Sequence, residues 1–184
     1  MRPLGSFSAI CRSRISNHFF ALGSDPVVIE FIEYIRLDDD EKALHWLKSA
    51  IFHNNLTPRS GYNLAVIRKQ DMEWLGWLGF GKAEDLSIGE ISFAYALHTK
   101  YWRNGYATEA LHACLHYCFD TLGVSKIFGE CDQKNYGSAR VMEKAGLFFE
   151  LAYLEVDPGT GHTCPTFRYS ICKEDWQAHI APGG

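Results

Sequence analysis

The sequence lacks several features that mark whole classes of protein. No apolar run reaches the roughly 18 residues that a membrane-spanning helix requires, so we expect no membrane partner. Basic residues are not in excess: 18 Lys and Arg stand against 22 Asp and Glu, a net charge of −4. A protein held by nucleic-acid phosphates is normally basic, so we expect no nucleic-acid partner either.

Paired cysteine motifs are also absent. The six cysteines, at positions 11, 114, 118, 131, 164 and 172, include no C-x-x-C. A chain of 184 residues buries roughly 70% of its unfolded surface and does not need disulfides. We therefore expect reduced thiols, a cytoplasmic location and one domain over residues 1–184.

Acidic residues are missing from the first 24 positions, which hold three arginines and five serines. This composition leaves two interpretations open. One is a mitochondrial transit peptide, and the other is a short strand followed by an ordinary helix.

Hydrophobic periodicity and turn residues predict a mixed α/β fold. A helix is expected to begin at Asp38–Glu41, whose acids suit a helix N-terminus, and to end at Asn54–Asn55. Further elements are expected as strands over 62–68, 74–80, 90–97, 125–131, 147–156 and 164–172, and as helices over 107–122, 135–146 and 174–180. Trp74 and Trp77, three apart on a strand, are expected on opposite faces.

The helix predicted over 107–122 carries one apolar stripe at i, i+3, i+4 spacing and ends at Gly123. It also contains four residue types that bind metals: His112, Cys114, His116 and Cys118. The two histidines share one helix face, and the two cysteines share another about 160–200° away. One ion cannot be reached by both pairs, so no metal site is predicted.

The segment from Leu97 to Ala107 joins a predicted strand to this helix. Gly105 lets the backbone approach a ligand closely, and the free N–H groups of the first helical turn suit an anion. Lys100 and Arg103 add positive charge. The alternative is an ordinary strand-to-helix turn, and no Gly-Lys-Ser/Thr follows to make it a Walker loop.

Two motifs carry a family resemblance. Tyr101-Trp102-Arg103-Asn104-Gly105-Tyr106-Ala107-Thr108-Glu109-Ala110 resembles the acetyl-CoA signature of the GCN5-related N-acetyltransferases (GNAT). Asn135-x-x-Ser138-x-Arg140-x-x-Glu143-Lys144-x-Gly146 resembles a second segment of the ribosomal-protein alanine/serine N-acetyltransferase branch. The resemblance covers about residues 16–176. Trp102 stands where the signature usually has Gln or Arg, and Arg103 replaces its usual first glycine.

The resemblance implies a GNAT fold. This is a mixed, mostly antiparallel sheet of about seven strands, flanked by helices, whose central strands 90–97 and 125–131 splay apart. Residues 1–15 would hold a truncated first strand or an atypical N-terminus, because Arg2-Pro3-Leu4 is similar to the end of the family's first strand.

The resemblance also implies acetyl-CoA as co-substrate. Its pantetheine arm would pair with the backbone of residues Leu97, His98 and Thr99. Its pyrophosphate would bind the amides of residues Arg103, Asn104, Gly105, Tyr106 and Ala107. Asn135 would bond the pantetheine amide, unless it serves only as a helix N-cap.

For the chemistry, the resemblance makes Ser138 the proton donor to the leaving thiolate. Met142 occupies the position of a tyrosine that many relatives use, and it cannot donate. Glu90, on the polar face of its strand, is the candidate general base, although a solvated strand end would look the same. Glu150 and Glu155 are further candidates.

The acceptor is expected to be a primary amine, most simply a protein or peptide N-terminus. An α-amino group is roughly a tenth neutral at pH 7, whereas a lysine is less than about a thousandth neutral. A site without a strong base therefore suits an α-amino group better than a lysine. The alternatives are a small amine, such as an amino acid, polyamine or antibiotic, and a CoA-binding module without activity. The sequence does not indicate an oligomeric state.

Overall fold

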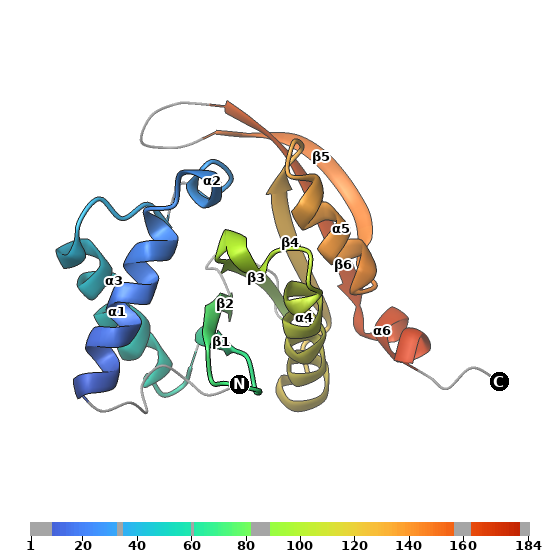
Figure 1. Ribbon diagram of the computed structural model, residues 1–184. Coiled ribbons are helices and arrows are strands. Elements are labelled where there is room, and N and C mark those ends of the chain that lie inside the picture. Colours follow the sequence, from blue (N-terminus) through green and yellow to red (C-terminus); the bar gives the residue numbers. More distant parts are fainter. Residues whose placement is uncertain (1–8, 33–34, 60, 82–88, 157–162, 181–184) are drawn as a thin grey trace. The chain divides into compact units, whose positions relative to one another are not determined.

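A computed structural model describes residues 9–32, 35–59, 61–81, 89–156 and 163–180 (Figure 1). The chain divides into two compact units, which are described separately here. The first comprises Met1–Gly81 and Ala94–Tyr106, and the second Lys82–Phe93 and Ala107–Gly184. The single domain inferred from the length stays a prediction.

From the third helix onward, the helices and strands follow the order that the sequence predicts, within one or two residues at most ends. The elements in chain order are α1 (Ala9–Gly23), α2 (Pro26–Ile29), α3 (Asp40–Asn54), β1 (Gly61–Ile67), β2 (Trp74–Gly81), β3 (Glu90–Leu97), the 3₁₀ helix η3 (Thr99–Tyr101), α4 (Tyr106–His116), the π-helix η4 (Tyr117–Leu122), β4 (Lys126–Asp132), α5 (Tyr136–Lys144), β5 (Phe148–Val156), β6 (Thr163–Cys172) and α6 (Lys173–Ile180). The described sheet has six strands in the order β1-β2-β3-β4-β6-β5. The expected seventh strand, at Arg2-Pro3-Leu4, lies outside the described residues.

In the first unit, α1 packs on α3, and both share one hydrophobic core with β1 and β2. Helix α3 begins where the acids predict, because the Asp39 carboxylate accepts a bond from Lys42 N at 2.7 Å. At its other end the buried Asn54 side chain bonds the backbone N–H and C=O of Asn63, each at 2.8 Å. The helix is thereby fixed to β1.

The prediction for the two tryptophans of β2 is wrong. Trp74 and Trp77 are each 6% exposed and belong to the same core. A β-bulge is the reason: Ile67 faces Trp74 and Val66 faces Gly76, so Leu75 is an extra residue in β2. The extra residue shifts the alternation and brings both rings to one side.

In the second unit, the helix predicted over 107–122 changes type. The α-helix ends at His116, and residues Tyr117–Leu122 form a π-helix that ends at the left-handed Gly123. Leu111, Leu115 and Phe119 of the predicted stripe are buried. The wider π turn moves Leu122 off the stripe, and it is 37% exposed.

The strands β3 and β4 pair in parallel, but only over part of their length. Their register runs from Glu90–Lys126 to Phe93–Gly129. At its end Gly129 is required, because a Cβ there would lie 2.4 Å from the Phe93 ring. Partial pairing is what splayed central strands require. None of the described helices combines the length and apolar character needed to cross a membrane.

Candidate functional site

The turn between β3 and α4 has an unusual backbone. Arg103 and Gly105 both adopt left-handed conformations, with φ values of 62° and 81°. Helix α4 then begins at Tyr106, so its first N–H groups have no partner within the helix. Alternating left-handed residues before a helix N-terminus form a concave row of N–H donors that suits an anion. The predicted pyrophosphate residues therefore lie in a segment with the required chemistry.

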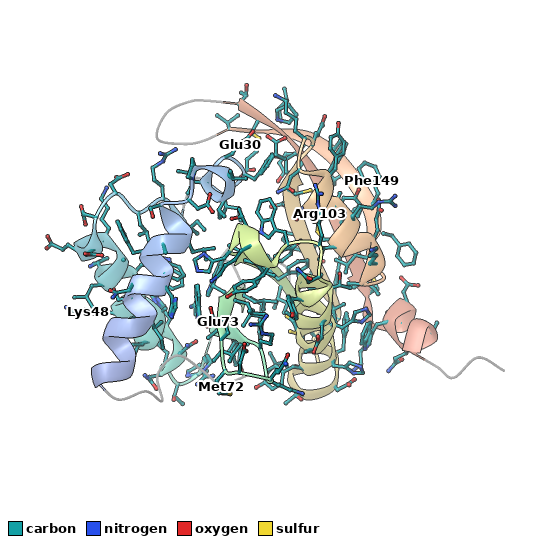
Figure 2. The ribbon with its side chains drawn as sticks, in the orientation of Figure 1. Glu30, Lys48, Met72, Glu73, Arg103 and Phe149 are labelled. Atoms are coloured by element: carbon teal, nitrogen blue, oxygen red, sulfur yellow. The ribbon has the colours of Figure 1, made fainter. Side chains whose placement is uncertain are left out.

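Several side chains hold this turn in place. Trp102 Nε1 donates to the Leu97 carbonyl at 2.7 Å, and Asn104 Nδ2 donates to the Trp102 carbonyl at 2.9 Å. The Tyr101 hydroxyl donates to Glu73, and Lys100 forms an ion pair with the same carboxylate at 3.3 Å. Glu73 is labelled in Figure 2. The hydrogen bonds from Tyr101 and Lys100 hold the pKa of Glu73 below its usual range. Trp102, which departs from the family signature, thus stabilises the turn through its hydrogen bond to Leu97.

Backbone atoms expected to pair with pantetheine already have partners within the turn. The carbonyls of Leu97, His98 and Thr99 accept bonds from the Trp102 indole, Tyr101 N and Trp102 N. Each carbonyl oxygen keeps a second lone pair. The predicted pairing would use those lone pairs, and it stays a prediction.

His98 lies in an aromatic cluster of the first unit. Its ring centroid is 5.3 Å from Trp74, on which His18 stacks at 5.5 Å. Burial, followed by the charges of Lys100 and His18, lowers the pKa of His98. The lowered pKa favours the neutral imidazole, which can accept a proton.

Asp25 is a functional candidate that sequence reasoning missed. One carboxylate oxygen caps α2 by accepting from Val27 N, and the other accepts from Thr99 Oγ1, both at 3.0 Å. From the sequence, Asp25-Pro26 indicates only a break between elements. Its contact with the turn, 74 residues away, has no sequence signal.

In the second unit, Asn135 and Ser138 begin α5. Asn135 Oδ1 accepts from Ser138 N at 3.0 Å, so the N-cap interpretation is observed. The cap uses the amide oxygen, and the amide nitrogen still offers two N–H donors to a ligand. Capping and the predicted pantetheine bond are therefore compatible.

Cys131 on β4 lies next to Ser138 and was not singled out from the sequence. Burial and the neighbouring Asp132 raise the pKa of Cys131 to about 11, although a hydrogen bond with Ser138 acts in the opposite direction. A thiol with such a pKa stays protonated at neutral pH. The Ser138 hydroxyl thus has an S–H group beside it.

The base candidates have different surroundings. Glu90 is the first residue of β3, seven residues and roughly 23 Å along the strand from Leu97. Lys126 Nζ bonds Glu150 at 2.6 Å. Burial raises the pKa of Glu150, but hydrogen bonds from Lys126 and Ser170 and the charges of Lys126 and Arg168 together outweigh it, so the pKa is lowered. Glu155 accepts from Thr166 Oγ1 at 3.3 Å. Glu90 lies in register with Lys126 on the neighbouring strand, and Glu90 as base stays a prediction.

The four helical residues considered for a metal do not converge. Cys114 and Cys118 are buried with their sulfurs 3.8 Å apart, whereas His116 bonds the exposed Asp120. Across the described ranges, no group of three or more His, Cys, Asp or Glu side chains is placed to hold a metal.

Comparisons with known proteins agree with this geometry. A family model described as an acetyltransferase (GNAT) domain matches residues 14–147. The uncharacterized protein YkkB of Bacillus subtilis is 31% identical over 136 residues, which are 71% of this chain and 74% of YkkB.

Two solved structures from Vibrio cholerae share the fold. One, assigned as a ribosomal-protein-serine acetyltransferase, is 17% identical with a TM-score of 0.70 and covers 90% of each chain. The other is a spermidine N-acetyltransferase in complex with CoA and spermine, 17% identical with a TM-score of 0.70, covering 92% of this chain and 94% of its own.

Proposed function

Because the chain belongs to the GNAT acetyltransferase family and is an acetyl-CoA-dependent N-acetyltransferase, we propose that it acetylates the N-terminal amine of a protein or peptide. The observation that best supports acetyl-CoA binding is the conformation of the turn before α4. Arg103 and Gly105 there adopt left-handed backbone conformations next to a helix N-terminus.

The reaction is a direct attack in a ternary complex. The neutral amine nitrogen attacks the thioester carbonyl, its proton passes to a base or water, and the C–S bond breaks as the tetrahedral intermediate collapses. The CoA thiolate leaves and takes a proton. Ser138 is the proposed donor, with the Cys131 thiol beside it as its own hydrogen-bonding neighbour.

The base available near the turn supports an α-amine acceptor. Burial lowers the pKa of His98, which makes its imidazole a weaker base. An α-ammonium group, with a pKa of about 7.7–8, can lose its proton to such a base or to water, whereas lysine at about 10.4 requires a much stronger one.

Acetylation of a small amine is the second candidate. The specific observation in its favour is the shared fold with a spermidine N-acetyltransferase bound to CoA and spermine. A CoA-binding module without activity is the third. A cytoplasmic location is also proposed, supported by the absence of disulfides among the described cysteines.

The deciding experiment is an acetyl-CoA-dependent screen. Peptides with different first residues are compared with amino acids and polyamines, and release of free CoA thiol is measured. We expect the highest kcat/KM on a peptide with a free N-terminus and none on the same peptide blocked at its N-terminus. Preference for spermidine would overturn the proposal in favour of the second candidate. CoA binding without turnover on any amine would favour the third.

A further inference from the structure

The loop between β1 and β2, residues 68–73, has a closed and uncommon backbone. Arg68 N donates to the Glu73 carbonyl, and Met72 N donates to the Arg68 carbonyl, both at 2.9 Å. Met72 adopts a left-handed φ of 60°, which is uncommon for a residue with a side chain. Met72 and Glu73 are labelled in Figure 2. This backbone fixes the directions in which the side chains of the loop leave it.

Asp71 holds the guanidinium of Arg68 in one orientation. Its two carboxylate oxygens accept from Arg68 Nε at 2.9 Å and from Arg68 Nη2 at 2.6 Å. The oxygen that accepts from Nε also accepts from Glu73 N at 3.3 Å. A guanidinium has five N–H donors in a planar fork, of which the bonds to Asp71 use two. Arg68 can therefore bind further groups without losing much additional freedom.

Arg68 contacts the turn before α4 on both sides of its left-handed residues. The guanidinium carbon lies over the Tyr101 ring, 5.6 Å from its centroid. Arg68 also forms a hydrogen bond with the Tyr106 side chain, and its bonds with Asp71 and, next, Tyr106 raise the pKa of Arg68. Tyr101 precedes the left-handed pair, and Tyr106 follows it as the first residue of α4. One side chain therefore spans the segment that is predicted to bind pyrophosphate.

The other end of the loop binds the same turn through an opposite charge. Glu73 accepts from the Tyr101 hydroxyl and pairs with Lys100 at 3.3 Å. Tyr101 is thus held at its ring by Arg68 and at its hydroxyl by Glu73. The charges in these contacts cancel, because Arg68 pairs with Asp71 and Glu73 pairs with Lys100. The loop is therefore suited to fix the geometry of the turn and does not add charge to an anion site.

We propose that residues 68–73 are a positioning element for the acetyl-CoA turn, and that Arg68 sets the spacing between its two ends. Arg68 is a positioning residue because it acts through Tyr101 and Tyr106. Amides bind an anion well only when they converge on it, so a fixed spacing from η3 to α4 maintains the affinity for pyrophosphate. The proposal rests on the proposed function only in that acetyl-CoA binds at this turn.

The test is isothermal titration of the full chain with three probes. They are CoA, dephospho-CoA, which lacks the 3′-phosphate, and pantetheine, which lacks the nucleotide and the pyrophosphate. Arg68→Met should weaken binding of CoA and of dephospho-CoA by the same factor, about fivefold to tenfold, and leave pantetheine binding unchanged. A general loss of structure would weaken the binding of all three.

Tyr106→Phe removes the hydroxyl that Arg68 binds and should reproduce part of the loss. The double variant should lose no more CoA affinity than Arg68→Met alone, because both substitutions break one connection. The matched control is Arg59→Met, since Arg59 also lies over a tyrosine ring, that of Tyr62 at 4.8 Å, at the other end of β1. It should leave CoA affinity unchanged.

Far-UV circular dichroism checks that each variant is folded, and Tyr106→Phe replaces Arg68→Met as the test if the latter unfolds. Unchanged CoA affinity in the folded variant overturns the proposal, as does an equal loss for pantetheine or in Arg59→Met. A loss for CoA but not for dephospho-CoA would show that Arg68 binds the 3′-phosphate directly, and this also overturns it. So does a wild type that binds pantetheine as tightly as CoA.

These titrations contain no acceptor amine. Failure of the peptide acceptor in the acetylation screen therefore leaves their expected results unchanged, and failure of the Arg68 prediction leaves the choice of acceptor unchanged. The two proposals can be overturned separately.

Discussion

At the scale of single residues, the two left-handed positions before α4 differ in what they require. Arg103 adopts a φ of 62° although it carries a side chain, and Gly105 adopts a φ of 81° with none. A Cβ at Gly105 would meet nothing within 4 Å. The constraint at Gly105 is therefore the backbone conformation itself, because space is available.

Gly105→Val should weaken acetyl-CoA binding tenfold or more, about 1.4 kcal/mol. A β-branched residue disfavours the left-handed conformation, so the amides would turn away from the pyrophosphate. Isothermal titration with acetyl-CoA measures the change. Gly61→Ala is the control, since a Cβ there meets only the Phe80 carbonyl at 3.8 Å. A folded Gly105→Val protein with normal affinity would exclude this turn as the pyrophosphate site.

Ser138→Ala should lower kcat about 10–100-fold, less than the full general-acid effect because water partly substitutes. KM for acetyl-CoA should change little, because Asn135 and the turn amides remain. Steady-state kinetics measure both constants, and Ser138→Thr should retain most of the rate. If kcat stays within about twofold while KM rises sharply, Ser138 binds the cofactor and another group donates the proton.

Stability should depend on pH through His98. The pKa of His98 in the folded protein is below its ordinary value of 6.5, so the unfolded chain binds more protons just below that pH. The melting temperature should therefore fall as the pH drops below about 6.5. His98→Asn should flatten this dependence, and His45→Asn on the exposed face of α3 should not. Thermal melts across this range that show equal slopes for wild type and His98→Asn would refute the assignment.

At the scale of elements, the turn before α4 is held by contacts from distant parts of the first unit. Asp25 connects it to α2, and Glu73 connects it to the start of β2. Both carboxylates contact η3, which Trp102 alone separates from the left-handed Arg103. The conformation of the turn therefore depends on two elements besides β3 and α4.

Thr99→Val removes the hydroxyl that Asp25 accepts while the cap of α2 stays intact. Loss of this bond should cost about 1 kcal/mol of unfolding free energy and weaken acetyl-CoA binding severalfold. Urea unfolding and calorimetric titration measure the two effects. Thr99→Ser keeps the donor and should resemble wild type; a Thr99→Val protein indistinguishable from wild type would show that the bond contributes nothing.

Elements governed by local chemistry were predictable from the sequence. The cap at Asp39, the stop at Gly123 and the cap at Asn135 lie where expected, because capping depends on a few adjacent residues. The extra Leu75 and the π-helix were not, because they arise from how a strand or helix meets its neighbours. The same distinction holds for the candidate site. Gly105 could be predicted from the residues around it, whereas Asp25 could not, because it acts through a tertiary contact.

At the scale of the whole molecule, neither compact unit is a continuous piece of chain. β3 contributes its first half to one unit and its second half to the other, and α4 begins at the boundary between them. A unit built from two segments cannot complete its core before both segments are in place. The two units should therefore depend on each other for stability.

Unfolding in urea should accordingly be one cooperative transition. Four of the five tryptophans lie in the first unit and five of the six cysteines in the second. Tryptophan fluorescence and thiol reactivity therefore report on different units. We expect coincident midpoints, and two separated transitions would show that the units are independent domains.

The bulge in β2 has a consequence for aligning this chain with its relatives. Leu75 is a one-residue insertion relative to the pairing of β1 with β2, and it separates two core aromatics by three positions instead of two. A relative whose β2 lacks this bulge should carry its two large core residues at alternate positions. Aligning such a relative with this chain then requires a one-residue gap between Trp74 and Trp77.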